Sequence, residues 1–237
     1  MKYALVNGFK SLPSPGIRGI CPHCSSDMIS KCGRVKIWHW AHKSREMCDP
    51  WWENETEWHR NWKDHFPPEW QEISHIDESS GERHIADVRN PFGLVVEFQH
   101  SNISLEERLS REKFYGDIIW VVDGNRGSLD KAYFNMGLYG PIQDNPLAYQ
   151  IEWLGKSRLL HNWGESTVKV YLDFGEDTLW RLVFYDSDKK RGAVGPISKT
   201  VFINDCHKGK NISVSYLPEN ADREKYKMPR PLREIPH

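Results

Sequence analysis

The stretch HIADVRNPFGLVVEFQHS, residues 84–101, contains two apolar runs, and each run carries one acidic residue, Asp87 in the first and Glu97 in the second. Side chains alternate between the two faces of a strand, so Glu97 and Gln99 are expected to project from one face. The Asn-Pro pair at residues 90 and 91 is a turn signal between the runs. The stretch therefore predicts two neighbouring strands with an acid on each.

The segments on either side alternate between helical and strand patterns. In chain order we predict a helix, three strands, a helix and a strand, at residues 51–66, 70–76, 83–90, 94–101, 104–115 and 117–123. An α/β core is the simplest packing of this order. Three later apolar segments, 168–175, 178–186 and 199–205, predict a β-rich C-terminal extension.

Two acids inside apolar runs are costly to bury together, because each carboxylate disfavours ionisation of the other. A divalent cation between them removes this cost, and oxygen ligands suit Mg²⁺ or Mn²⁺. We expect Asp87 and Glu97 to meet around such a cation where the strands diverge. The alternative is a pair of edge-strand charges whose carboxylates lie in water.

The predicted helix at 51–66 carries a polar stripe. Glu55, His59 and Lys63 lie at i, i+4 and i+8, so they share one face. Glu55 could hold a metal-bound water above the sheet, and the other two could face a phosphate. The alternative is an amphipathic helix that buries Trp58 and Trp62 and leaves its charges in water.

Two pairs of metal-ligating residues lie near the N-terminus. CPHC contributes Cys21 and Cys24, WHWAH contributes His39 and His42, and each pair has two residues between its members. Such pairs can close a tetrahedron around Zn²⁺ and fold a segment that is too small to fold by apolar burial.

The histidine pair is spaced more closely than in common zinc fingers, so Cys48 or Cys32 could replace one histidine. Under the alternative interpretation the cysteines are buried thiols and His39 packs among tryptophans.

Length and composition place few limits on function. The chain has 237 residues and a formal net charge of −1, which neither requires nor excludes a nucleic-acid partner. It has no run of about 18 apolar residues that could span a membrane and no apolar core of a signal peptide, so we expect a cytoplasmic protein without membrane contact. Changes in composition predict a zinc-binding unit, an α/β core, a β-rich extension or subdomain and a polar arm, at residues 1–50, 51–150, 151–207 and 208–237.

These motifs together resemble a known nuclease superfamily. A glutamate-bearing helix, a strand with Asp, a strand with ExQ and a helix with Arg111 and Tyr115 follow the core order of PD-(D/E)xK nucleases, which have a restriction endonuclease-like mixed sheet flanked by helices. Within that superfamily the chain resembles the competence protein CoiA-like family over roughly residues 4–125. The motifs that carry the resemblance are CPHC, Gly33, HWAH, the Glu55–Lys63 run, HIADV, EFQHS and RExFY before IWVVD.

The resemblance implies roles for particular residues. Asp87 and Glu97 would hold the catalytic metal, and Glu55 would be the helix acid. Gln99 stands where most of the superfamily has lysine; its amide can orient water but cannot supply a positive charge or take a proton. The general base stays open between a second metal, a substrate phosphate and a histidine, either His59, His84 or His100. The side chains that would contact a neighbouring phosphate or support the site are His59, Lys63, His84, Arg111 and Tyr115.

We therefore expect a Mg²⁺- or Mn²⁺-dependent deoxyribonuclease with a structural zinc unit, acting on DNA in uptake, recombination or repair. The sequence leaves a homodimer open. Two alternatives are a non-catalytic DNA-binding module on a nuclease-like fold and a zinc-stabilised adaptor that binds protein.

Overall fold

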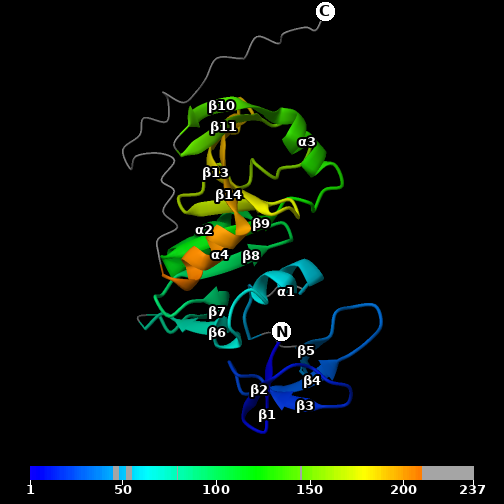
Figure 1. Cartoon of the computed structure of the whole chain (residues 1–237). Helices are drawn as coiled ribbons and strands as arrows, with labels where there is room; N and C mark the ends of the chain where they lie inside the picture. Colours follow the sequence, from blue (N-terminus) through cyan, green and yellow to red (C-terminus); the bar gives the residue numbers. More distant parts are fainter. Residues whose placement is uncertain (45–47, 52–54, 79, 145, 210–237) are drawn as a thin grey trace, which may run out of the picture. The chain divides into compact units, whose positions relative to one another are not determined.

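The computed structural model describes residues 1–44, 48–51, 55–78, 80–144 and 146–209. The chain forms two compact units: unit 1 holds Met1–Asp123 and the segment that begins at Thr200, and unit 2 holds the strands between Gly124 and Lys199 (Figure 1 labels the elements). The four-part division predicted from composition stays a prediction.

The N-terminal part of unit 1 is a five-stranded antiparallel sheet of order β2-β1-β3-β4-β5. Its strands are β1 Ala4–Val6, β2 Phe9–Ser11, β3 Arg18–Ile20, β4 Asp27–Lys31 and β5 His39–His42. The turn between β1 and β2 contains Asn7 and Gly8, both at positive φ, as a two-residue hairpin turn requires.

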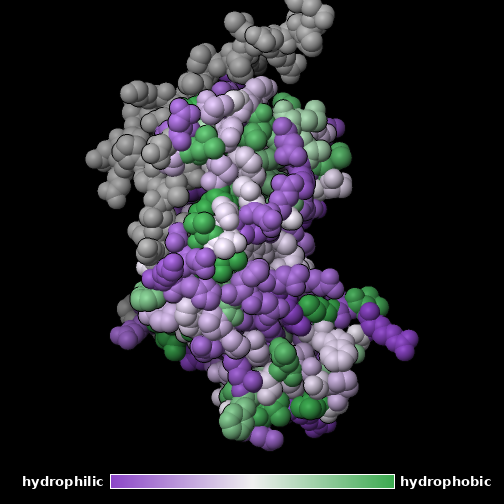
Figure 2. Space-filling model, viewed as in Figure 1, coloured by the Kyte–Doolittle hydropathy of each residue, from purple (hydrophilic) through white to green (hydrophobic). Residues whose placement is uncertain are grey.

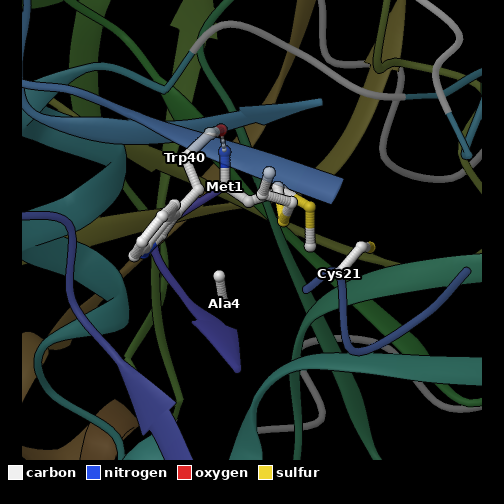
Figure 3. Close-up of a cluster of buried hydrophobic side chains, with 5 residues drawn as sticks. Met1, Ala4, Cys21 and Trp40 are labelled. Carbon is white, nitrogen blue, oxygen red and sulfur yellow. Dashed lines mark hydrogen bonds between the residues drawn. The ribbon is translucent and has the colours of Figure 1, made fainter. Parts of the chain in front are cut away.

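The apolar core of this sheet is small. It consists of Met1, Ala4, Cys21, Met28 and Trp40, and Met1 N donates a hydrogen bond to Trp40 O (Figure 3). So few buried apolar side chains stabilise the sheet only weakly, and a bound metal could supply additional stability.

The second part of unit 1 contains the predicted α/β core. Strands β6 Gln71–Ile76, β7 Arg83–Arg89 and β8 Val95–Gln99 are antiparallel neighbours, and β9 Ile118–Asp123 runs parallel to β8. Helix α2, Leu105–Tyr115, makes the crossover between β8 and β9 that a parallel pair needs. The predicted α-β-β-β-α-β order is confirmed.

The first helix is shorter than predicted. Helix α1 spans Glu57–Lys63, with Thr56 Oγ1 accepting the His59 amide as N-cap, and it is followed by the 3₁₀ turn η1, Pro68–Trp70. Residues 52–54 of the predicted helix lie outside the described residues. Trp62 stacks on Phe98 of β8, which fixes α1 against the sheet.

Unit 2 is mostly antiparallel sheet. It contains α3 Asp130–Gly137 and the strands β10 Leu138–Asp144, β11 Leu147–Glu152, β12 Lys169–Asp173, β13 Thr178–Asp186 and β14 Arg191–Ser198, in the order β10-β11-β14-β13-β12. Helix α3 and the β10-β11 hairpin were not predicted from the sequence.

The segment 199–205, predicted as a strand, is helical. It forms most of α4, Lys199–His207, whose buried residues Phe202 and Cys206 lie four apart, the spacing of one helical face. Phe202 contacts Trp62, and Asn90 Nδ2 donates to Cys206 O at 2.8 Å, so tertiary contacts select the helix. In the part of the chain that the structure describes, no helix is long and apolar enough to cross a membrane.

Candidate functional site

Strands β7 and β8 separate at the two acids. Toward Asp87 their ladder ends at the pair Val88↔Val96. Beyond that pair, Asp87 N donates to Glu97 Oε1 at 3.1 Å, and Phe98 N donates to Asp87 Oδ2 at 3.0 Å. Each carboxylate therefore takes the place of a backbone carbonyl at the fork, which holds both acids at the point where the sheet opens.

Asp87 is paired with a histidine from α1. His59 Nε2 lies 2.7 Å from Asp87 Oδ2, and the Asp87 side chain is 17% exposed. Burial alone would raise the pKa of Asp87, but His59, Lys63 and the Phe98 amide outweigh it and hold the pKa below its usual value. Asp87 is therefore ionised at neutral pH and still reachable from solvent.

Glu97 has the opposite electrostatic character. Its side chain is buried, and Arg111 Nη1 of α2 donates to Glu97 Oε2 at 3.1 Å. Burial first, and then the neighbouring charge of Asp87, raise the pKa of Glu97 to about 8 despite Arg111. Two acids one strand apart are thus pushed to opposite protonation states, as is common in sites that handle protons or cations.

The predicted polar stripe forms a second charge cluster, but Glu55 precedes the N-cap Thr56 and so lies outside α1. Lys63 Nζ lies 2.8 Å from Glu55 Oε1 and 3.1 Å from Glu72 Oε1, and Arg60 Nη2 lies 2.8 Å from Glu55 Oε2. Burial opposes the charge on Lys63, but the two glutamates raise its pKa above the usual value. Glu55 therefore stays ionised through Lys63 and Arg60, and its pKa is lowered although burial opposes this.

Glu72 belongs to this cluster, and sequence reasoning missed it. Its backbone has a φ of 51°, which is rare for a residue other than glycine, and its carboxylate accepts the amides of Lys2 and Tyr3 at 2.7 and 3.1 Å. An acid near the start of the predicted strand at 70–76 was the available signal in the sequence. Glu72 joins the N-terminal sheet to the helix stripe.

These groups line one cavity of about 60 Å³ within unit 1. The predicted site residues in its wall are Glu55, His59, Lys63, Asp87, Glu97, Arg111 and Tyr115. We call this cavity the acid pocket. Asp49, Trp51 and Glu72 also line it and were not predicted.

Two predicted residues lie outside the wall of the acid pocket. The Gln99 amide donates to Ser101 O at 3.2 Å, although it shares a strand face with Glu97. His84 is held between Asp49 Oδ1 at 2.9 Å and Glu82 Oε1 at 2.8 Å. The third histidine considered as a base, His100, binds Asp123 through Nδ1 at 2.7 Å. Of the three, His59 is the one in the pocket wall.

A short segment, residues 48–51, connects the acid pocket to the cysteine region. Asp49 Oδ2 accepts the Ile85 amide of β7 at 2.7 Å, and Trp51 O accepts Arg111 Nη2 at 2.7 Å. The Trp51 ring stacks on His84. Cys48 lies three residues before Trp51. A metal that holds Cys48 would therefore also help to position Trp51 O, which accepts a hydrogen bond from Arg111.

The cysteine region forms a metal-ligand cluster. Single donor atoms of Cys21, Cys24, His42 and Cys48 all lie within 4.8 Å of one another. Cys21 Sγ is 3.8 Å from Cys48 Sγ, and Cys24 Sγ is 3.3 Å from His42 Nε2. Ligands about 2.3 Å from a tetrahedral zinc would be about 3.8 Å apart, so the cluster can hold a zinc ion.

Local geometry and charge favour this cluster. Cys21 O accepts the Ser25 amide at 3.0 Å, which closes the tight turn that brings two thiols together, and Ser25 adopts a φ of 62°. The hydrogen bond from Cys48 lowers the pKa of Cys21 to about 4, while the same contact raises the pKa of Cys48. Metal ligands must be deprotonated, and a thiol with a lowered pKa releases its proton readily. The Cys21 and Cys48 pair is therefore suited to bind a metal cation.

His39, predicted as the fourth ligand, lies outside the cluster, and the alternate residue Cys48 takes its place. His39 and His42 begin and end strand β5, three positions apart, so they point to opposite faces of the sheet. Instead, His39 Nδ1 lies 2.9 Å from Ile37 O. Cys32, the other alternate residue, is also absent from the cluster.

The raised pKa of Glu97 predicts a pH dependence of stability. Between its ordinary value of 4.5 and about 8, the folded protein keeps a proton at Glu97 that the unfolded chain has released. The free energy of unfolding should therefore fall as pH rises through this interval, while the lowered pKa of Asp87 matters only in acid.

Glu97→Gln should remove this decline, because an amide cannot release the proton. We expect the pH 5 to pH 8 loss of stability to be on the order of 3 kcal/mol larger in the original protein than in the variant. Urea unfolding at both pH values measures the difference. Equal losses in the two proteins would show that Glu97 titrates normally.

Comparison with known proteins matches part of the chain to a family model. The family model described as "Competence protein CoiA, N-terminal domain" matches residues 19–50, which contain all four members of the cysteine-histidine cluster. No curated protein and no solved structure matches the chain. The similarity to the N-terminal domain of competence protein CoiA therefore covers residues 19–50.

Proposed function

We propose that the chain is a metal-dependent nuclease that hydrolyses DNA phosphodiester bonds at the acid pocket, on a restriction endonuclease-like core. The observation that carries the proposal is the fork between β7 and β8, where Asp87 and Glu97 accept each other's strand amides beside Lys63, His59 and Arg111. Acids held at an opening sheet beside cations are suited to a phosphate ester and its counter-ion.

The donor set fits a divalent magnesium or manganese ion. Asp87 is ionised and partly exposed, and Glu97 retains a proton that a cation could replace. Asp87 and Glu97 would hold the ion, with Arg111 moving from Glu97 Oε2 toward the substrate. When bound, the ion supplies Lewis acidity toward a phosphate oxygen and lowers the pKa of water.

The chain's own residues supply the remaining functions. His59 Nε2 is engaged by Asp87, while the buried Nδ1 has no hydrogen-bond partner among the described residues, so His59 can accept a proton at Nδ1. Lys63 and Arg111 can bind phosphate oxygens in exchange for their present carboxylate partners. Tyr115 is buried in the pocket wall, where burial raises its pKa and keeps it neutral.

The direct test is incubation of the purified protein with linear, circular, branched and single-stranded DNA in Mg²⁺, Mn²⁺ or EDTA. Cleavage is expected with either ion and not with EDTA. Circular DNA separates internal from end-dependent cleavage. Failure to cleave any substrate with either metal would reject the nuclease proposal.

A second candidate function is DNA binding without hydrolysis on the same fold. The observation that favours it is the pairing of the pocket's cations with acids of the chain itself: Arg111 Nη1 lies 3.1 Å from Glu97 Oε2, and Lys63 Nζ lies 2.8 Å from Glu55 Oε1 and 3.1 Å from Glu72 Oε1. Metal-independent DNA binding without cleavage would select this function.

The biological setting follows from the same proposal. The match of residues 19–50 to a competence protein domain supports a role in DNA uptake or recombination. A cytoplasmic location, a bound structural zinc and a homodimer are further parts of the proposal, and sedimentation of the purified protein tests the last.

A further inference from the structure

The loop between β4 and β5, residues 32–38, lies at a second cavity beside the acid pocket. We call it the basic loop; its sequence is CGRVKIW. The second cavity has a volume of about 480 Å³ and is lined by Val35, Lys36, Ile37 and His39 on the loop side and by Glu55, Thr56 and Glu57 near α1. Met1 and Glu55 line both cavities, so the two are neighbours.

The basic loop contains two cations, Arg34 and Lys36, and the residues on either side of it add two more. Between Met28 and Ser44 the chain has four cations, Lys31, Arg34, Lys36 and Lys43, and no Asp or Glu. Arg34 and Lys36 are exposed. The loop extends away from its sheet in Figure 1, and Figure 2 shows hydrophilic and hydrophobic surface side by side at that place. This charge pattern fits a polyanion.

Apolar side chains stand in the same loop. Val35 is 97% exposed and Trp38 is 44% exposed. Trp38 Nε1 donates to Gly33 O at 3.1 Å, so the indole is tied to the tip of its own loop while much of its surface remains open. An anchored, exposed indole among cations is the combination that stacks an unpaired base while the neighbouring phosphates are neutralised.

We infer that the basic loop and the second cavity bind a single-stranded segment of DNA, with phosphates at Arg34 and Lys36 and a base on Trp38, and direct it toward the acid pocket. The inference rests on the proposed function, because the bound strand is taken to be cleaved at the acid pocket. Binding of the strand to the basic loop itself requires no hydrolysis. Glu57 on the opposite wall repels phosphate and keeps the backbone on the loop side. A base in a duplex cannot stack on Trp38, because its faces are already covered.

The test uses the full chain in EDTA and measures fluorescence anisotropy of a labelled single strand and of the matching duplex over a range of salt concentrations. The single strand is expected to bind more tightly than the duplex. The double variant Arg34→Ala/Lys36→Ala should weaken single-strand binding about 10-fold and lower the slope of log K against log salt by about 1.4, for two lost phosphate contacts. The matched control is Lys156→Ala/Arg158→Ala, an exposed Lys/Arg pair of equal spacing in unit 2, which should leave binding unchanged.

Trp38 supplies an independent variant. Trp38→Ala should weaken single-strand binding about 10-fold, and Trp38→Phe, which keeps a stacking ring without the hydrogen bond to Gly33, should restore most of it. Unchanged binding in the Arg34/Lys36 variant, or duplex binding as tight as single-strand binding, would overturn the inference. If binding depends on the basic loop but the protein does not cleave DNA in Mg²⁺, the nuclease proposal is rejected and the binding inference stands. If the protein cleaves DNA equally well with the loop variants, the binding inference is rejected and the nuclease proposal stands.

Discussion

Cys48→Ser is expected to remove zinc from the protein and to unfold the N-terminal sheet. The original protein should carry about one zinc per chain, and the variant close to none, because the cluster loses one of its four donors and the contact that lowers the pKa of Cys21. The apolar core of this sheet is too small to compensate. Metal analysis and thermal unfolding measure both effects.

Two variants make this result specific. Cys32→Ser removes a thiol outside the cluster, and His39→Ala removes the histidine on the opposite face of β5, so both should keep the metal. Zinc loss from His39→Ala together with zinc retention in Cys48→Ser would restore the ligand set expected from spacing alone and contradict the structure.

Removal of zinc should also loosen the contacts that position residues of the acid pocket. Cys48 begins the segment in which Asp49 accepts the Ile85 amide and Trp51 O accepts Arg111. Releasing Cys48 frees this segment and weakens the contact that holds Arg111 at Glu97. Hydrogen exchange of residues 83–89 should therefore accelerate when a chelator removes the metal, whether or not the protein cleaves DNA.

Asp87→Asn is expected to have the largest effect on cleavage. It removes the ionised ligand of the proposed cation and the partner of His59, while the amide can still accept the Phe98 N–H. We expect the cleavage rate in saturating Mg²⁺ to fall by about 100- to 1000-fold. Single-strand binding in EDTA should be retained or become tighter, because one negative charge near the phosphates is gone.

Asp123→Asn is the matched control for this variant. Asp123 is likewise an aspartate bonded to a histidine in unit 1, through His100 Nδ1 at 2.7 Å, but it does not line the acid pocket. It should cleave at a rate close to that of the original protein. If both variants lose the same cleavage activity, the loss reflects a disturbed fold and not a role of Asp87 in the reaction. Full activity of Asp87→Asn would show that Asp87 takes no part in the reaction.

Local patterns in the sequence were enough for the element order and for part of the site. Period-2 and helical patterns depend on near neighbours in the chain, so β6 to β9 and α2 could be predicted. The acids Asp87 and Glu97 stood out because each interrupts an apolar run. The cysteine pair Cys21 and Cys24 was visible because a tight turn brings its thiols together without help from other segments.

Other features depend on contacts between distant residues. Spacing alone could not choose between His39 and Cys48, because the choice depends on β5 being a strand and on how residues 48–51 return to the cluster. Glu72 and Asp49 join the site through backbone amides and side chains of other segments of the chain. Such partners leave no local pattern, so they could not be predicted.

Tertiary packing also overruled local preference in two places. The β-branched segment at 199–205 has strand propensity, but burial of Phe202 and Cys206 on one face makes it a helix. Gln99 keeps the face of β8 that alternation assigns to it, yet its amide binds Ser101 in the following turn. Alternation specifies which face a side chain leaves from, whereas the nearest available partner determines where its polar end lies, and only the folded chain supplies that partner.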